Sequence, residues 1–181
     1  MGSTLNRIFQ ETAHAHSETQ RHAAASIERA ASAMRDSLAR GGKILIFGNG
    51  GSASDAQHFA SELVNRFQKS RNAFAGIALT TDSSVLTSIA NDDSFDRVFA
   101  RQIEALGRAG DVAVGISTSG TSANVIAGLH QARQQKLTTV ALTGADSMIA
   151  DVCVRVSSSV TARIQEVHRT IIHVWCELIE M

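Results

Sequence analysis

The sequence predicts an α/β fold, a three-layer, doubly wound, parallel sheet of five strands with a helical extension at the N-terminus. Two observations predict it. Short runs rich in Val, Ile and Leu alternate with longer segments of helical periodicity, which is typical of parallel βαβ units. In addition, the apolar run 44–47 breaks at four residues, Gly48-Asn49-Gly50-Gly51, and then continues as a helix, which is a strand–turn–helix unit.

Length and composition limit the possible classes of protein. A chain of 181 residues predicts one domain, 1–181, with 44% hydrophobic and 19% charged residues, as in soluble globular proteins. Seventeen basic residues balance seventeen acidic ones, so we expect neither a nucleic-acid partner nor an acidic membrane surface. The sequence contains no run of 18 apolar residues, so we expect no membrane span. The polar N-terminus predicts a cytoplasmic protein. We expect Cys153 and Cys176 to be reduced core residues.

Residues 4–40 are expected to be helical, because apolar residues recur at helical spacing from Leu5 to Leu38. The polar middle, 14–22, allows either one helix or two helices with a break. Its three histidines do not favour a metal site, since His14 and His16 would point to different sides of a helix. A long helix outside the sheet usually packs on a partner, so segment 1–40 is predicted to be an oligomerisation element.

The remaining elements follow in order. The expected strands are 44–47, 76–80, 112–117, 139–142 and 152–156. The expected helices are a central one that begins at Ser52 or Ser54 as N-cap, followed by 81–93, 95–106, 123–135 and 161–180. Residues 146–150 are a turn or a short helix. The last strand alternates in polarity, which places it nearer an edge.

Two loops are expected at the carboxyl ends of strands, where doubly wound sheets bind ligands. The glycine turn 48–52 leads into a helix N-terminus, which favours an anion. The loop 117–122 has five hydroxyl residues and a glycine before a helix, which favours a phosphate monoester over N-capping alone. A dinucleotide site is the competing interpretation, because Gly48, Gly50 and Ala53 have the required spacing. It lacks the acidic residue that should end the second strand.

The central and last helices each carry a polar stripe. His58 and Glu62 are four residues apart and share a face away from the apolar side. An incidental pair on a solvated face explains this spacing equally well. On the last helix, Gln165, Arg169 and His173 form a stripe that is either solvated or lines a site, and periodicity does not decide between the two. His168 borders the core and is expected to be packed.

The motifs, taken in order, are Gly-Asn-Gly-Gly-Ser at 48–52, Asp-Ala-Gln-His-Phe-Ala-x-Glu at 55–62, Ile-Ala-Asn-Asp at 89–92, Gly-Ile-Ser-Thr-Ser-Gly-x-Ser-Ala-Asn-Val at 115–125 and Arg-Ile-Gln-Glu-x-His-x-x-x-x-His at 163–173. Together they resemble the sugar isomerase (SIS) family, over about residues 41–181. The resemblance implies the SIS fold and a homotetramer with active sites between subunits. It also implies isomerisation of sedoheptulose 7-phosphate to D-glycero-D-manno-heptose 7-phosphate, a precursor of ADP-heptose and the lipopolysaccharide core.

The resemblance also implies a metal site and roles for individual residues. One Zn²⁺ per subunit would be bound by His58, Glu62, Gln165 and His173, donor types that suit zinc. Glu62 would take the carbon proton to form an enediol, and His173 would serve the oxygens as acid and base. The implied phosphate-binding residues are Ser117, Thr118, Ser119 and Ser122 with the loop amides. The implied contacts to the rest of the substrate are Asn49, Gly50, Gly51, Ser52, Asp92 and Gln165.

The sequence departs from the family pattern after Thr143-Gly144, where the segment is shorter than in most members, and at Ala162, where some members carry a polar residue. The shorter segment puts in doubt the loop between the fourth and fifth strands, not the site. Two alternatives to this isomerase stay open on other grounds. One is a non-catalytic SIS protein that binds a replication-initiator partner; its group lacks the Glu and the final His of the site, whereas Glu62 and His173 are present here. The other is an isomerase or sensor for a different sugar phosphate.

Overall fold

The computed structural model describes residues 2–181, so Met1 of the predicted segment 1–40 lies outside the described residues. The helices are α1 (Gly2–Ala39), α2 (Gly51–Val64), α3 (Ser83–Asp92), α4 (Val98–Leu106), α5 (Ala123–Gln134) and α6 (Thr161–Ile179), with a 3-10 turn, η1 (Phe95–Arg97), before α4. The strands are β1 (Ile44–Gly48), β2 (Gly76–Ala78), β3 (Val112–Ser117), β4 (Thr138–Thr143) and β5 (Val152–Arg155).

All five strands lie in one parallel sheet with the order β2-β1-β3-β4-β5. This confirms the predicted doubly wound fold. The chain leaves β1 toward β2 on one side and returns to β3 on the other, so the strand order reverses between β1 and β3. In such sheets the ligand crevice opens at that reversal, outside the carboxyl ends of the strands. The prediction that the last strand lies near an edge is also confirmed.

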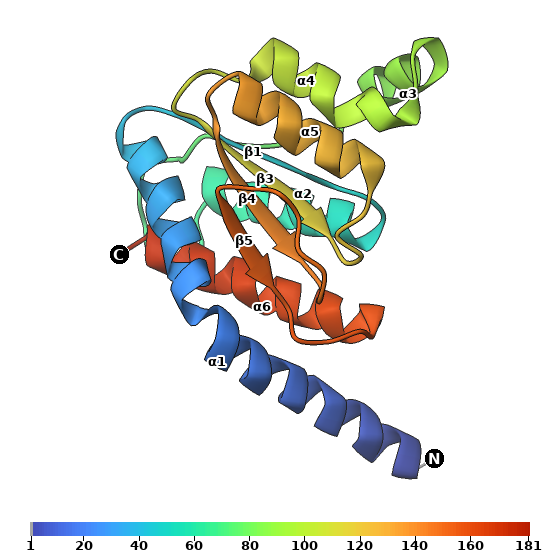
Figure 1. Ribbon diagram of the computed structural model, residues 1–181. Helices are drawn as coiled ribbons and strands as arrows, with labels where there is room; N and C mark the ends of the chain where they lie inside the picture. The colour runs from blue at the N-terminus through green and yellow to red at the C-terminus, as the bar shows by residue number, and fades with distance from the viewer. Residues whose placement is uncertain (1) are drawn as a thin grey trace.

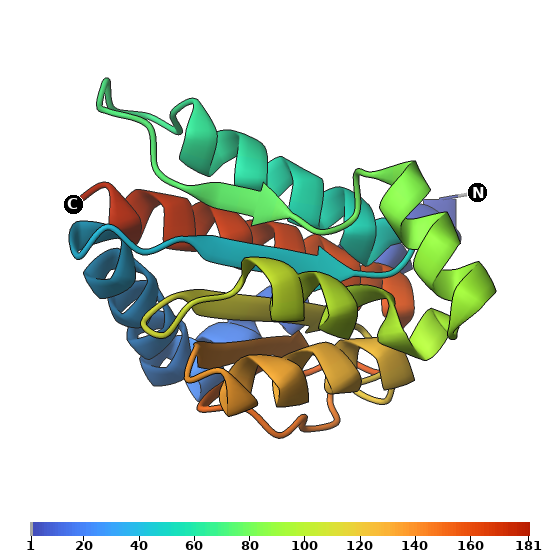
Figure 2. The ribbon, with the colours of Figure 1, turned by 90° about the horizontal axis from the view of Figure 1, so that it is seen from above.

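Helices cover both faces of the sheet (Figures 1 and 2). On one face, α1, α2 and α6 pack with alternate strand residues such as Ile46, Val114 and Leu142 into one apolar cluster, which contains the fully buried Trp175. On the other face, α4 and α5 pack against Leu45 and Phe47 in a second cluster. Both faces of β1 and β3 are therefore buried, which explains their continuous apolar runs.

The helix α1 continues unbroken through the polar segment 14–22, so the alternative of two helices is wrong. Its middle is held by small side chains rather than by large anchors. Ala15, Thr19 and Ala23 recur every four residues and are buried. Thr19 also accepts a hydrogen bond from the backbone N–H of Ser157, at 3.1 Å. Small residues allow the helix to lie close to its neighbours without leaving an apolar stripe that sequence periodicity would detect.

Several local boundaries differ from the sequence prediction. The N-cap of α2 is Gly50, with φ +55°, and neither Ser52 nor Ser54 has that role. Glycine suits this position because it adopts positive φ without steric cost. Strand β2 has only three residues, because the chain turns away at Thr80 toward α3, although Leu79 N–H still donates to Ile46 O at 2.9 Å. Residues 146–150 are irregular, with a bend at each end, and form no helix.

The two cysteines are free, and Cys176 is buried as expected, whereas Cys153 is only half-buried. Burial, together with the nearby carboxylates of Glu62 and Glu180, raises the pKa of the Cys176 thiol to about 12. This thiol therefore stays protonated and unreactive. In the described part of the chain, no helix is long and apolar enough to cross a membrane.

Candidate functional site

The glycine turn after β1 and the hydroxyl loop after β3 lie side by side at the reversal of strand order. A reciprocal pair of amide hydrogen bonds joins them, because Asn49 Nδ2 donates to Asn124 Oδ1 at 2.8 Å and Asn124 Nδ2 donates to Asn49 Oδ1 at 2.9 Å. Asn124 is buried at the start of α5. The two loops predicted to bind the ligand are therefore fixed relative to each other by uncharged groups.

The hydroxyl groups of loop 117–122 are gathered inward. Ser117 Oγ lies 3.0 Å from Ser122 Oγ and 3.4 Å from Ser119 Oγ, and it accepts a hydrogen bond from the N–H of Gly120. Gly120 has φ +71°, which allows this tight loop. Ser122 is the N-cap of α5, but its side chain makes no capping hydrogen bond. N-capping therefore does not explain these hydroxyls, and the helix N–H groups remain free for an anion.

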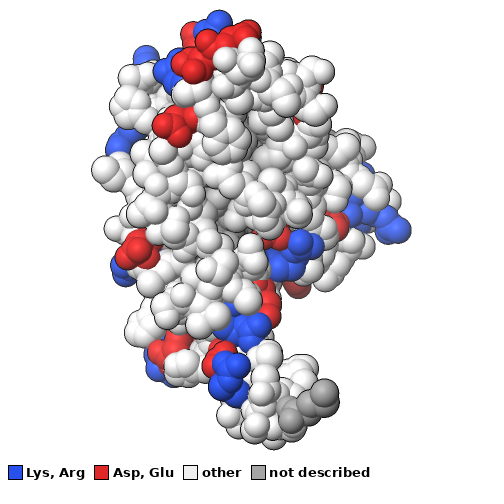
Figure 3. Space-filling model, turned by 90° about the vertical axis from the view of Figure 1, so that its right-hand side faces the viewer, with Lys and Arg blue, Asp and Glu red and all other residues white. Residues whose placement is uncertain are grey.

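Figure 3 views the molecule from the side on which the strands end, and charged side chains there lie mainly toward the periphery. The centre of this face is largely uncharged. An anion bound there would be held by hydroxyl and amide N–H groups and the positive end of the α5 dipole.

The two helices that carry the polar stripes, α2 and α6, run side by side in the same direction. Their stripes meet at three successive levels along the helices. At the first level, the Gln165 amide lies so close to Gly51 that a Cβ at position 51 would overlap it. At the second, Arg169 binds Asp55. The third level is formed by His58 and His173. The two polar stripes therefore face each other.

At the third level, three titratable side chains converge. His58 Nε2 lies 2.9 Å from His173 Nε2 and 3.7 Å from Glu62 Oε1. The side chains of His58 and Glu62 are 26% and 21% exposed, so they are half-buried rather than solvated. The ring of Phe67 packs against His173, with centroids 5.4 Å apart. Sequence spacing left open an incidental surface pair, and this convergence with α6 contradicts it.

The charge state of this cluster follows from its geometry. The two Nε2 atoms share one hydrogen, so at least one imidazole is neutral and accepts. Burial and then the guanidinium of Arg169 lower the pKa of His58, and the nearby His173 lowers it further, while Glu62 and Asp55 act in the opposite direction. A neutral His58 with an Nε2 lone pair suits a metal ligand.

The residues present fit part of a zinc site. His58, Glu62 and His173 provide nitrogen and oxygen donors, the types that Zn²⁺ takes in proteins. Gln165 does not join them within one chain, because it lies eight residues before His173, about 12 Å along the helix axis. Among residues 2–181, no group of three or more His, Cys, Asp and Glu side chains is arranged to hold a metal ion on its own. A complete four-donor set needs movement of these side chains or a further donor.

The other predicted residues are placed as follows. Ser52 is buried and its N–H donates to Asn49 O at 2.9 Å, so it orders the glycine turn. Thr118 is half-buried, and its carbonyl lies against Gly144. Asp92 is exposed at the end of α3, where it accepts a hydrogen bond from Asn91 and lines a separate pocket with Arg101. His168 is fully buried and contacts the carbonyl oxygen of Thr143 at 3.1 Å, which confirms the expected packed histidine.

Sequence reasoning missed Asn124, which joins the two loops, and the ion pair of Arg71 with Glu180 near the C-terminal ends of α2 and α6. Asn124 is separated from Asn49 by 75 residues, and no periodicity connects the two. Arg71 and Glu180 lie in an irregular segment and at a helix end, where polar residues are common. Phe67 follows the end of α2, and only the structure shows its contact with His173.

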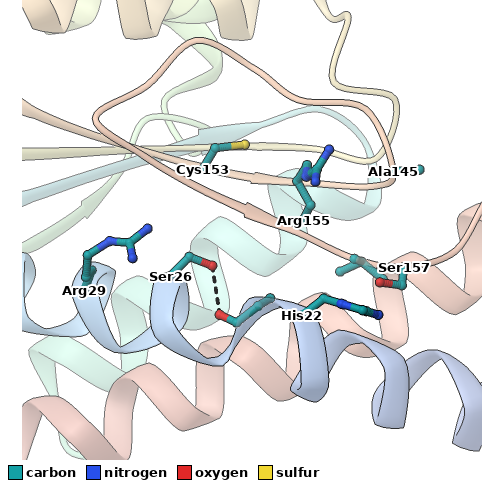
Figure 4. A pocket seen from close by; sticks show the side chains of 9 residues that line it. His22, Ser26, Arg29, Ala145, Cys153, Arg155 and Ser157 are labelled. Atoms are coloured by element: carbon teal, nitrogen blue, oxygen red, sulfur yellow. Dashed lines mark hydrogen bonds between the residues drawn. The ribbon is translucent and has the colours of Figure 1, made fainter.

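One cavity adjoins this site, and another lies away from it. A groove of about 680 Å³ is lined by Gly51, Asp55, Gln165 and Arg169 among others, a size typical of small-molecule sites. Another cavity, of about 540 Å³, lies between α1 and β5 and is lined by Arg29, Cys153 and Arg155 (Figure 4). None of the predicted site residues lines the second cavity, so the groove between α2 and α6 is the better candidate.

Comparisons with known proteins show which family the chain belongs to. A family model described as "SIS domain" matches residues 8–144. A phosphoheptose isomerase from Roseiflexus sp. (strain RS-1) is 55% identical over 80% of this chain and 76% of its own length. One from Thiobacillus denitrificans is 49% identical over 95% of this chain and 91% of its own length. The structure of phosphoheptose isomerase from Neisseria gonorrhoeae superposes with a TM-score of 0.93 at 45% identity, covering 99% of this chain and 98% of that one.

Proposed function

The chain belongs to the phosphoheptose isomerases of the SIS domain family, which makes it an aldose–ketose isomerase of sedoheptulose 7-phosphate, and we propose that Glu62 and His173 move the protons in this reaction. The observation that carries the assignment is the meeting of Glu62, His58 and His173 between two parallel helices. The product is D-glycero-D-manno-heptose 7-phosphate. Its use as a precursor of ADP-heptose and the lipopolysaccharide core is part of the proposal.

The reaction moves a proton between C1 and C2 through an enediol, so it needs a base for a carbon-bound proton and an acid–base group for the oxygens. Glu62 is a carboxylate that accepts and returns protons, and it is the base. His173 faces the same point from α6 and transfers the proton between the two oxygens. The half-buried position of Glu62 keeps bulk water from competing for the carbon proton.

The phosphate end of the substrate is assigned to the serine loop. Ser117, Ser119 and Ser122 provide three hydroxyls that already face one another. The N-terminal N–H groups of α5 and the helix dipole add donors for a dianion. Asn49, with Gly50 and Gly51, and the Gln165 amide line the path for the sugar hydroxyls. Asp92 lies away from this path in one chain, in a separate pocket. It is assigned to substrate contact only from another subunit or after a movement of α3.

The separation between these two parts supports an active site shared between subunits of a homotetramer. Glu62 lies eleven residues after Gly51 on α2, which is roughly 16 Å along the helix axis. A heptose 7-phosphate is roughly 10 Å long, from bonds of about 1.5 Å. One substrate therefore does not span both parts of a single chain. A serine loop from one subunit with Glu62 and His173 from another resolves this mismatch.

A zinc ion bound to His58, Glu62 and His173, with Gln165 from a neighbouring subunit as the fourth donor, is also part of the proposal. When bound, it would polarise the substrate carbonyl as a Lewis acid. A residue that ligates the metal does not carry a proton at the same time, so Glu62 and His173 transfer protons only while they are not ligated, and His58 is assigned as a ligand only. A cytoplasmic location completes the proposal, since a charged sugar phosphate does not cross a bilayer unaided.

The names of the relatives favour an enzyme over a non-catalytic SIS protein that binds a replication-initiator partner. Relatives at 49–55% identity carry the isomerase name. This chain keeps Glu62 and His173, which both lie beside His58, and a protein that only binds a partner has no need for this cluster.

The test is an isomerase assay with sedoheptulose 7-phosphate, in which the aldose product is detected directly. Wild type, Glu62→Gln and His173→Gln are compared with a matched control, Gln57→Glu, on the exposed side of α2. Loss of a catalytic acid or base typically costs about a hundredfold to ten-thousandfold in turnover. Folded variants with near-normal substrate binding but such losses support the assignment. Turnover above a tenth of wild type in Glu62→Gln would remove Glu62 as the base.

A further inference from the structure

A buried ion pair lies behind the proposed acid–base residues, at the C-terminal ends of α2 and α6. Arg71, in the irregular segment between α2 and β2, donates from Nε to Glu180 Oε1 at 2.9 Å. The two side chains are only 13% and 2% exposed. Neither residue belongs to the predicted site, and neither lines the groove between α2 and α6.

Arg71 holds the end of the helix that carries Glu62. Its Nη2 donates to the carbonyl oxygen of Glu62 at 2.8 Å, and its Nη1 donates to the carbonyl oxygen of Leu63 at 2.9 Å. Helix α2 ends at Val64, so these carbonyls lack partners within the helix. The guanidinium also lies over the ring of Phe74, 4.0 Å from its centroid. Arg71 therefore caps the last turn of α2 and prevents it from fraying.

Glu180 holds the residue that supports His173. Its carboxylate accepts hydrogen bonds from three successive backbone N–H groups, those of Phe67 at 2.9 Å, Gln68 at 3.0 Å and Lys69 at 2.9 Å. Such a row of amides forms an anion-binding nest. The nest fixes Phe67, whose ring packs against His173 with an interplanar angle of 30°. One ion pair therefore fixes the backbone at Glu62 and the aromatic support of His173.

We propose that Arg71 and Glu180 are positioning residues for catalysis, which set the placement of Glu62 relative to His173 without touching the substrate. This inference rests on the proposed roles of Glu62 and His173. It assigns the ion pair to the proton-transfer step, because it lies at the opposite end of α2 from the glycine turn and the serine loop. Loss of the pair should lower turnover and leave phosphate binding nearly unchanged.

The variants are Arg71→Met, which keeps the length and the packing on Phe74, and Glu180→Gln, which keeps one acceptor oxygen. The matched control is Arg133→Met, which removes an exposed arginine paired with Asp151. For Arg71→Met we expect kcat to fall between about tenfold and a hundredfold, since displacements near 1 Å have effects of this size. KM should stay within about twofold, and Glu180→Gln should lose less.

A structural role alone would act differently. It would lower the melting temperature and the folded fraction, while kcat per folded molecule and the kinetic isotope effect stayed at the wild-type values. The isotope effect is measured with substrate deuterated at the carbon that loses its proton. A misplaced Glu62 makes proton transfer more rate-limiting, so the isotope effect should rise in Arg71→Met. If that variant does not fold, Glu180→Gln gives the same readout.

Glu62→Gln, assayed in parallel, separates the two hypotheses. An inactive Glu62→Gln with Arg71→Met and Glu180→Gln at wild-type kcat and isotope effect would overturn the positioning role and keep the proposed function. An active Glu62→Gln would remove Glu62 as the base and, with it, the premise of the positioning role. A lowered kcat with a raised isotope effect in Arg71→Met, and an unchanged Arg133→Met, would support both.

Discussion

Arg169 donates from both Nε and Nη2 to a single oxygen of Asp55, at 3.0 and 2.7 Å. The two residues do not share the burial equally, because the side chain of Asp55 is 5% exposed and that of Arg169 is 42% exposed. The buried carboxylate therefore depends on a partner that reaches it from the groove. This pair joins α2 to α6 midway between the Gly51–Gln165 contact and the two histidines.

Arg169→Met should destabilise the fold, because it leaves a buried carboxylate without its cation. Breaking a buried pair from one side typically costs about 3–5 kcal/mol, and partial exposure of Arg169 reduces this to roughly 2 kcal/mol. Urea unfolding measures the change. Arg97→Met, which removes an exposed pair with Asp93, is the control and should change stability by less than about 0.5 kcal/mol. Equal stability of both variants would contradict the dependence of Asp55 on Arg169.

Ser119→Ala should weaken substrate binding more than it slows the reaction. A hydrogen bond to a charged group contributes about 1.5–3 kcal/mol, so KM should rise about tenfold or more while kcat stays within about threefold. Ser88→Ala, which removes an exposed hydroxyl on α3, should change neither constant. A fall in kcat at constant KM would instead place Ser119 beside the reacting carbons.

Active sites shared between subunits should allow two inactive variants to restore each other. Glu62→Gln removes the base, and Ser119→Glu places a carboxylate where the phosphate binds. Random mixed tetramers would contain some sites with an intact loop from one chain and an intact Glu62 from another, roughly a quarter of all sites. Co-expressed variants should therefore recover about that fraction of wild-type activity. No recovery in tetramers proven to be mixed, or a monomer by light scattering, would rule out the shared site.

The ion pair at the C-terminal end of α6 should make stability depend on acid pH. Burial alone would raise the pKa of Glu180, but the backbone N–H groups of Lys69, Phe67 and Gln68 and the guanidinium of Arg71 outweigh it and lower the pKa to about 2. The folded pKa lies below the ordinary value of 4.5, so this stabilisation is complete above about pH 5. It is lost progressively as pH falls from 4.5 toward 2.

Unfolding free energies of wild type and Glu180→Gln, measured from pH 6 to pH 3, check this dependence. The variant should be less stable at pH 6, by on the order of 2 kcal/mol. The difference should narrow as wild type loses stability in acid. Parallel curves for the two proteins would show that Glu180 does not contribute through its charge.

Removal of the metal should abolish activity, and replacement of a histidine ligand should lower the zinc content. Dialysis against a chelator should abolish turnover, and added zinc should restore it, if His58, Glu62 and His173 hold the ion. His58→Gln should bind less zinc by elemental analysis, whereas His130→Gln, on the exposed side of α5, should match wild type. Full activity in protein proven free of metal would show that the side chains act without an ion.

The fold was predictable from the sequence because its strands, such as 112–117, are continuous apolar runs separated by helical periodicity. The site was predictable only in part. His58, Glu62 and His173 were placed on two polar stripes, but periodicity is a property of one helix and does not say which stripes meet. The structure supplies that relationship, since α2 and α6 lie parallel on one face of the sheet.

Other features could not be predicted from the sequence, each for its own physical reason. The absence of a break in α1 depends on Ala15, Thr19 and Ala23, which pack closely yet carry no strong apolar signal. The N-cap at Gly50 depends on a positive φ, whereas propensity favours the neighbouring serines. Gln165 and His173 share a stripe, but their distance along α6 keeps them at different levels, so a motif read as one ligand set is divided in the single chain.

Because α1 is one unbroken helix, a rotation of one end about the helix axis turns the other end with it. Its 38 residues span about 57 Å, and the end near Leu5 and Phe9, which are 57% and 68% exposed, is rigidly coupled to the part that packs on β5. Inserting one residue near Ala24 would turn these apolar side chains by about 100° about the axis, and inserting seven would bring them back nearly into phase. The number of residues in α1 therefore determines the direction in which Leu5 and Phe9 face.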